Sequence, residues 1–249
     1  MSNLYKNMAE VYDDMYQSFI DYDEEFEFYN ALLIKYKCKS FVEIGCGSGN
    51  LAKRFSTYGE NYCGLDNSNE MLNIAKAKNP NARFIMDDMR NFYLQCKVNA
   101  GIITGRTISY LISDEDVLAA FAAINLNLTG KGLICFDCID AKKFIPLIRA
   151  DEKIIHQATI DNKNYYRESL WSVNDFQHGI FDWISHYYKE DEKGNRIKIG
   201  EDSSTLKAFC KDRVAALLKN TGFEVKEIIK KPSYAFDTFV MVAEKSFDL

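Results

Sequence analysis

The chain has 249 residues, of which 47% are hydrophobic and 27% charged, and its formal net charge at pH 7 is −5. This composition excludes a disordered or collagen-like chain and is typical of one large globular domain, or of one domain with an insertion. The acidic balance argues against a nucleic-acid ligand, because basic residues that neutralise phosphates supply most of that affinity. The N-terminus lacks the pattern of a signal peptide, and no apolar run reaches the roughly 18 to 20 residues of a membrane span. We therefore expect a cytoplasmic protein that binds neither nucleic acid nor membrane.

The seven cysteines are scattered, which argues against a disulfide framework. Cys135 and Cys138 have the CxxC spacing of redox and zinc sites, but they fall inside an expected strand and no second ligand pair accompanies them. We expect no metal site.

Strands and helices alternate along the first part of the chain. Helical spacing of Tyr22, Phe26, Tyr29 and Leu33 predicts a helix, and Asn67 with Glu70 resembles a capping box that opens another. Apolar runs predict strands at 41–45, 61–66, 82–88, 100–105 and 131–139, with helices expected at 50–59, at 69–78 and from Ser113 to Leu128. Strands that alternate with helices over short connections predict an α/β fold, a Rossmann-like doubly wound sheet.

The pattern changes after the fifth strand. Residues 141–205 are rich in aromatic and β-branched side chains separated by turn signals, which predicts a small antiparallel sheet inserted into the main domain. The main domain comprises 1–140 and 206–249, where a helix stopped by Gly222 precedes a closing antiparallel strand pair.

A glycine-rich segment, VEIGCGSGN, joins the first strand to its helix. Gly45, Gly47 and Gly49 have the spacing GxGxG, because Asn50 stands where a dinucleotide fingerprint has its third glycine. This spacing favours a methionine-type tail over a diphosphate. Asp66 ends the second strand, where a carboxylate can accept hydrogen bonds from both hydroxyls of a ribose.

These segments resemble class I methyltransferases that use S-adenosylmethionine. FVEIGCGSGNLA is similar to their motif I, with Glu43 at the acidic position before the first glycine, and MDDMRNF is similar to their adenine-binding segment. In that second segment Asp88 and Met89 are the matching residues, and Asp87 replaces a small residue. AEVYDDMYQSFIDY resembles the segment that precedes the fold in small-molecule enzymes related to glycine N-methyltransferase and the aminosugar N,N-dimethyltransferases.

The resemblance implies S-adenosylmethionine as cofactor, with S-adenosylhomocysteine as the product. The residues that it assigns to the cofactor are Tyr12, Tyr22, Glu43, Gly45, Cys46, Gly47, Gly49, Asp66, Asn67, Met71, Asp87, Asp88, Met89 and Thr104.

TGRTISYL, after the fourth strand, resembles the segment that borders the methyl-donor sulfur. The matching positions imply that Thr104, Arg106, Thr107 and Tyr110 lie near the reacting centre, with Tyr110 and Arg106 as catalytic candidates and Tyr110 as the best-placed base. Two departures stand out: Ala100 replaces a family aspartate, and Arg106 occupies a position that is usually apolar or acidic. The histidines, all in the insertion, are expected on the surface at positions 156, 178 and 186.

The implied reaction is in-line transfer of a methyl group to a nitrogen or oxygen of a small molecule. A macromolecular methyltransferase and a nucleotide-dependent oxidoreductase are weaker alternatives, and a cofactor-binding protein without turnover stays open. The aromatic residues of the insertion suit a pocket wall, a homodimer interface or a small core of their own, and they are Tyr165, Tyr166, Trp171, Phe181 and Trp183. We expect the insertion to choose the methyl acceptor.

Overall fold

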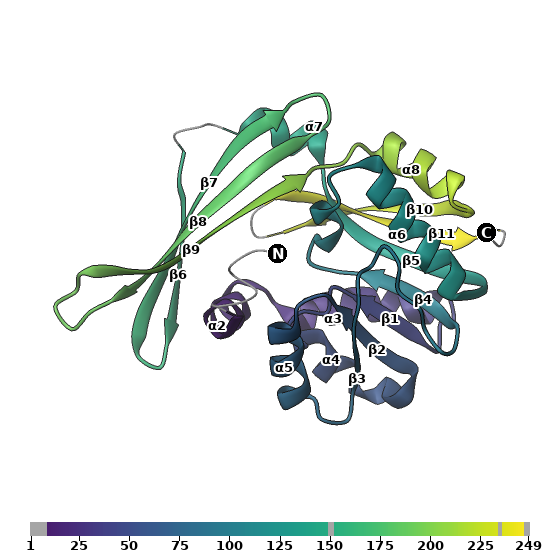
Figure 1. Ribbon diagram of the computed structural model, residues 1–249, viewed down its shortest axis with the longest axis horizontal. Helices are drawn as coiled ribbons and strands as arrows, with labels where there is room; N and C mark the ends of the chain where they lie inside the picture. Colours follow the sequence, from purple (N-terminus) through teal and green to yellow (C-terminus); the bar gives the residue numbers. More distant parts are fainter. Residues whose placement is uncertain (1–8, 149–151, 234–235, 247–249) are drawn as a thin grey trace.

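The computed structural model describes residues 9–148, 152–233 and 236–246, with the backbone alone for residues 9–12. It contains a seven-stranded sheet in the order β10-β11-β5-β4-β1-β2-β3 and a separate four-stranded sheet in the order β6-β7-β8-β9 (Figure 1). In the large sheet β1 to β5 are parallel, and β11 runs antiparallel between β5 and β10. The α/β, Rossmann-like fold with a closing antiparallel pair and an inserted antiparallel sheet is confirmed.

The strands of the large sheet are β1 (Phe41–Ile44), β2 (Tyr62–Asp66), β3 (Arg83–Met86), β4 (Val98–Ile103), β5 (Leu128–Ile139), β10 (Phe223–Pro232) and β11 (Asp237–Lys245). Those of the small sheet are β6 (Ile154–Ile160), β7 (Lys163–Asp175), β8 (Ile180–Glu190) and β9 (Arg196–Lys207). The α-helices are α2 (Ala9–Phe19), α3 (Tyr22–Lys35), α4 (Asn50–Arg54), α5 (Asn69–Lys78), α6 (Asp114–Asn127), α7 (Ala141–Phe144) and α8 (Lys211–Asn220). Short 3₁₀ helices are η1 (Phe55–Asn61), η2 (Thr107–Tyr110) and η3 (Ile145–Leu147).

Helices cover both faces of the large sheet because its central strands are apolar on both sides. Along β5, Ile134 and Phe136 belong to a core shared with α6 and α8, whereas Leu133 and Cys135 belong to a core shared with α3 and α4. Side chains of a strand alternate between the two faces of a sheet, so a nearly continuous apolar run is what a sheet buried on both faces requires.

Three local predictions are wrong in detail. The helix that begins after Ser113 ends at Asn127, because Leu128 already pairs with β4. The helix expected over 50–59 ends at Arg54 and continues as η1, in which Gly59 has φ of 53°. The N-cap of α5 is Ser68, whose hydroxyl accepts the N–H of Met71, so the capping box predicted for Asn67 and Glu70 does not form.

The two ends of the inserted segment meet beside the large sheet. Phe209 donates its N–H to the carbonyl of Ile139 at 2.8 Å and accepts the N–H of Ala141 at 3.0 Å. The small sheet therefore leaves the main domain and returns to it at one point. Helix α2 lies against this sheet (Figure 1), where Met15 packs with Ala158 and Tyr187. Within the described ranges, no helix is both long and apolar enough to cross a membrane.

Candidate active site

A cavity of about 620 Å³ lies at the carboxyl ends of β1, β2, β4 and β5. Its wall combines the loops after these strands, the junction of α2 with α3, and side chains of β8 and β9. Ligands of an open parallel sheet bind at this edge of the strands. The cavity is therefore the candidate active site.

The glycine-rich loop forms one part of the wall. Gly45 (φ 75°) packs so tightly that a Cβ atom would lie 2.7 Å from Oγ1 of Thr107, whereas a Cβ on Gly47 (φ 53°) would meet no protein atom within 4 Å. Cys46 lies between them in the wall. Gly49 has another role: it caps α4, and its Cβ would lie 3.0 Å from that of Ala75 on α5. The open space at Gly47 is where a ligand can approach the backbone.

Asp66 fastens this loop to the end of β2. One of its carboxylate oxygens accepts the N–H of Gly47 at 2.8 Å, and the other accepts the N–H of Ser68 at 2.9 Å. Burial raises the pKa of Asp66 above its ordinary value, although these bonds oppose that effect. Asn67 and Met71 lie beside it in the wall. The aspartate is thus held rigidly in the cavity wall, beside the glycine-rich loop.

Glu43 lies behind the glycine loop and is almost fully buried. It accepts hydrogen bonds from the hydroxyl of Tyr62 at 2.7 Å and from that of Thr104 at 3.4 Å. Burial raises the pKa of Glu43 to about 7. A cationic ligand group in the cavity would favour the ionised carboxylate.

The two neighbouring aspartates after β3, Asp87 and Asp88, have different surroundings. Asp87 lies in the cavity wall with Met89, whereas Asp88 forms a double hydrogen bond with Arg90, at 3.0 and 2.7 Å. This guanidinium lowers the pKa of Asp88. The structure therefore brings Asp87, rather than the motif-matching Asp88, to the cavity.

The four positions after β4 that the sequence assigned to the reacting centre all lie in the wall. Arg106 has a left-handed backbone (φ 61°), and its guanidinium bonds the hydroxyl of Ser233 at 3.1 Å and lies 5.2 Å from the ring centroid of Phe236. Tyr110 is 41% exposed. Both catalytic candidates border the cavity, but Arg106 is engaged with neighbouring side chains.

The N-terminal segment closes another side of the cavity. Tyr22 lies in the wall beneath Arg54, whereas the side chain of Tyr12 falls outside the described residues. Tyr16 and Phe19, which the sequence did not single out, also line the cavity from α2.

A buried Asp13 joins α2 to the glycine loop. Its carboxylate accepts hydrogen bonds from Ser48, Asn50 and Lys78, the one from Asn50 at 2.9 Å. These bonds hold α2 over the loop.

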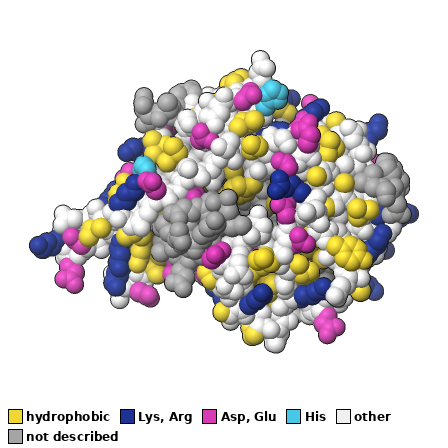
Figure 2. Space-filling model, in the orientation of Figure 1, with side chains coloured by type: hydrophobic (Ala, Val, Ile, Leu, Met, Phe, Trp, Pro, Cys, Tyr) yellow, Lys and Arg dark blue, Asp and Glu magenta, His cyan; other side chains and the backbone are white. Residues whose placement is uncertain are grey.

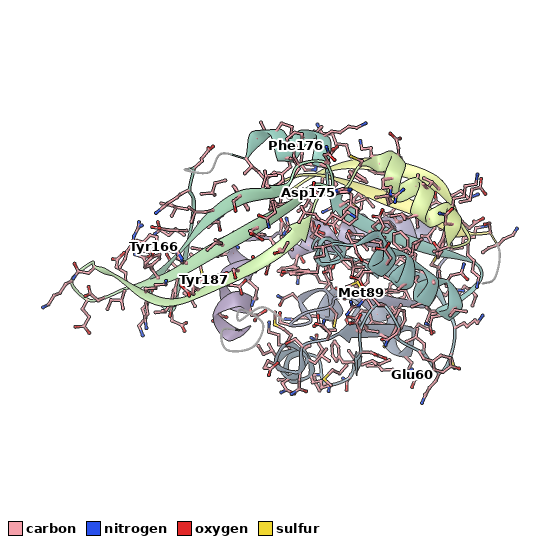
Figure 3. All side chains as sticks on the ribbon, turned by 45° about the horizontal axis from the view of Figure 1, so that its top comes forward. Glu60, Met89, Tyr166, Asp175, Phe176 and Tyr187 are labelled. Carbon is pink, nitrogen blue, oxygen red and sulfur yellow. The ribbon has the colours of Figure 1, made fainter. Side chains whose placement is uncertain are left out.

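The insertion supplies the roof of the cavity. Its contribution comes from one face of β8 and β9 and comprises Trp183, Ser185, Tyr187, Asp202, Ser204 and Leu206. Trp171 and Phe181 pack instead in a core with Phe144 and Phe236. Tyr165 packs near α2, and Tyr166 bonds Glu190 at 2.6 Å. Tyr166 and Tyr187 lie on the neighbouring strands β7 and β8 (Figure 3), but Tyr187 pairs with Arg167 and Tyr166 with Tyr188, so their side chains lie on opposite faces of the sheet.

Sequence reasoning missed several polar residues of the cavity wall: Glu25, Asp137, Lys231 and Ser233, with the roof residues Ser185, Asp202 and Ser204. No motif marks them, because they are isolated polar positions scattered along the chain. The expected surface position holds for His178, which pairs with Asp175, whereas His156 is half-buried and bonds Arg167 at 3.1 Å. Over the described ranges, no group of His, Cys, Asp or Glu has the arrangement of a metal site.

Comparisons with known proteins agree with this geometry. The family model of a methyltransferase domain matches residues 41–132. The Bacillus subtilis protein YqeM, whose name assigns it to the methyltransferases, is 24% identical over 252 residues, covering 98% of both chains. A dTDP-3-amino-3,4,6-trideoxy-alpha-D-glucopyranose N,N-dimethyltransferase of Streptomyces venezuelae is 29% identical over 98 residues, 39% of this chain and 41% of that one.

A solved structure with a similar fold is the S-adenosylmethionine-bound amino pentose methyltransferase CalS10 of Micromonospora echinaspora. Its TM-score is 0.81 at 17% identity, over 95% of this chain and 97% of that one. At this identity the likeness extends to the fold. Residues 41–132 are thus a methyltransferase domain, set in a fold that solved methyltransferases share.

Proposed function

We propose that this chain, an S-adenosylmethionine-dependent methyltransferase, transfers the methyl group to an amino group of a small molecule held beneath the inserted sheet. The observation that carries the proposal is the charge of the cavity wall. Its carboxylates are Asp21, Glu24, Glu25, Glu43, Asp66, Asp87, Asp137 and Asp202, and its cationic side chains are Arg106 and Lys231. A cleft lined by one sign of charge concentrates ligands of the opposite sign. A sulfonium donor and an ammonium acceptor both have that sign.

The wall near the glycine loop fits the cofactor. The space at Gly47 admits a ligand against the backbone, and each carboxylate oxygen of Asp66, which already accepts one backbone N–H, can accept a second hydrogen bond. We assign Asp66 to the ribose, Asp87 and Met89 to the adenine, and Glu43 to the cationic methionine end. S-adenosylmethionine supplies a methyl group on a sulfonium, which is already a strong electrophile. The residues therefore have to align the acceptor and exclude water.

The acceptor is assigned to the space between η2 and the roof. A volume of about 620 Å³ lies within the range of small-ligand pockets, so a compact molecule fits better than a folded macromolecule. On the face shown in Figure 2, acidic and basic side chains are interspersed, which is unlike the basic stripe of a nucleic-acid binder. Two of the similar proteins are named for amino sugars, which favours nitrogen as the nucleophile.

The test is methyl transfer from labelled S-adenosylmethionine to three pools: a low-molecular-weight metabolite extract, RNA and protein. The dTDP-3-amino-3,4,6-trideoxy-glucopyranose named for the Streptomyces enzyme is added as a defined amine probe. We expect labelled small molecules in which mass-spectrometric fragmentation places the methyl group on nitrogen. An O-methylated product, or label confined to RNA or protein, would contradict the proposed acceptor.

Calorimetry addresses the remaining alternatives. We expect S-adenosylhomocysteine to bind in the micromolar range and NAD not to bind. Cofactor binding without transfer to any pool would identify a binding protein rather than an enzyme. The domain boundaries at 140 and 205, the cytoplasmic location and the homodimer stay predictions.

A further inference from the structure

A buried aspartate in the cavity wall has no role in holding the glycine-rich loop. Asp137 lies at the carboxyl end of β5, in the cavity wall, and is 3% exposed. The strand is adjacent to β4, whose following loop borders the reacting centre. Asp137 is therefore within the part of the cavity that we assign to the acceptor.

Only one oxygen of this carboxylate is occupied within the described part of the chain. Oδ1 accepts the backbone N–H of Arg106 at 2.8 Å, and Oδ2 has no hydrogen-bond donor there. Glu43 and Asp66 in the same cavity wall differ from Asp137, since both oxygens of each accept a hydrogen bond. Because Asp137 lines the cavity, a ligand that brings a cationic N–H to Oδ2 can form a charge-assisted hydrogen bond there.

Charged and titratable groups surround Asp137 on every packed element. Arg106 and Lys231 stabilise the ionised carboxylate, whereas burial and Glu25 raise the pKa of Asp137 above its ordinary value. Tyr29 of α3 and Cys135 of β5 lie on the same side of the sheet, and burial, with this carboxylate as a smaller cause, raises the pKa of both. An ionised group whose pKa is raised is a better base than an exposed aspartate.

We propose that Oδ2 of Asp137 accepts the proton of the acceptor ammonium before methyl transfer. An N–H bond of the ammonium breaks as the O–H bond of the carboxyl group forms, which frees the lone pair on nitrogen. That lone pair attacks the donor methyl: the C–N bond forms, the C–S bond breaks, and its electron pair stays on sulfur. The inference rests on the proposed function and replaces Tyr110 as the base.

Asp137→Asn is the appropriate test, because the amide oxygen can still accept the N–H of Arg106 while the base is removed. At pH 7 we expect methyl incorporation into the metabolite extract to fall by about 10²- to 10⁴-fold. The remaining rate should rise about tenfold per pH unit between about pH 6 and 9, since only acceptor that is already deprotonated can react. The wild-type rate should fall instead at low pH, where Asp137 becomes protonated.

The affinity for S-adenosylhomocysteine and the melting temperature of the variant should stay near those of the wild type. Asp175→Asn makes the same chemical change at the last residue of β7 (Figure 3), where the carboxylate accepts the N–H groups of Gln177 and His178, and should leave the rate unchanged. Asp137→Glu, which keeps a carboxylate, should recover part of the rate and the wild-type dependence of the rate on pH at low pH. It serves as the second variant if Asp137→Asn disturbs folding.

Three results would overturn the inference. One is an unchanged rate in Asp137→Asn, and another is a loss that is equal at every pH, which would indicate a positioning residue. The third is Asp137→Glu with the pH profile of the Asn variant. Absence of incorporation by the wild type would instead contradict the proposed function itself, so the two failures are distinguishable.

Discussion

The Rossmann-like half and the inserted sheet present side chains to the cavity in different ways. In the first, functional groups lie in loops directly after strands and are bonded to one another, as Asp66 is to Gly47. In the second they alternate along β8 and β9, where Ser185 lies opposite Asp202 and Trp183 opposite Ser204. A loop at a strand end fixes a backbone shape for one ligand, whereas a sheet face offers positions that can change independently. The strand-end loops therefore suit a methyl donor that stays the same, and the face of the inserted sheet suits a methyl acceptor that varies.

Among substitutions that compare the two regions, the largest expected effect on cofactor affinity is at Gly47. Gly47 and Gly59 share φ of 53°, and a Cβ atom on either would meet no protein atom within 4 Å. Each Gly→Ala substitution should lower the free energy of unfolding by about 1 to 3 kcal/mol, because a positive φ disfavours a side chain, and the loss should be the larger one at Gly59, whose ψ is −128°. Gly47→Ala should in addition weaken S-adenosylhomocysteine binding about 100-fold or more, since its methyl group enters the cavity. Calorimetry and urea unfolding of both variants measure the two effects.

Gly59→Ala is the matched control and should retain cofactor affinity. Equal affinities of the two variants for S-adenosylhomocysteine would show that the cofactor does not approach the loop at Gly47. The Rossmann-like half could then not be contrasted with the inserted sheet as the part that holds the cofactor.

A smaller effect is expected at Asp66. Asp66→Ala leaves the N–H of Gly47 and the ribose hydroxyls without their acceptor, which costs about 1 to 3 kcal/mol. Cofactor affinity should therefore fall roughly tenfold or more while the fold stays intact. Asp88→Ala removes a carboxylate that pairs with Arg90 and should change affinity by less than about twofold. If both variants bind alike, the ribose lies elsewhere.

The smallest effect, and the one that isolates the roof, is expected for Trp183→Leu. Loss of the indole from the cavity wall should lower kcat/KM for the acceptor about tenfold, the size expected for a reshaped apolar pocket. Affinity for S-adenosylhomocysteine should stay within about twofold. Phe176→Ala, in the exposed turn after β7 (Figure 3), should change neither quantity. A parallel loss of cofactor affinity in Trp183→Leu would show that the roof also holds the donor.

The sequence predicted one region far better than the other, for physical reasons. Strand–helix alternation and glycine spacing are local patterns, so the order of elements and the loop at Gly47 could be inferred. Which of two adjacent aspartates faces the cavity depends on Arg90, a tertiary detail that no spacing encodes. Asp137 looked like one more strand residue, because its function depends on which neighbours leave an oxygen unbonded.

The meeting of the ends of the insertion at Ile139 and Phe209 has a consequence for evolution and engineering. Because the backbone leaves and re-enters the large sheet at adjacent points joined by two hydrogen bonds, the length of the segment between them does not strain β5 or α8. Domain insertions are tolerated where the ends of the added segment lie close together. The junction at Ile139 and Phe209 can thus stay constant while the inserted sheet changes. A lineage could acquire a new methyl acceptor by exchanging the inserted segment and keeping the cofactor site.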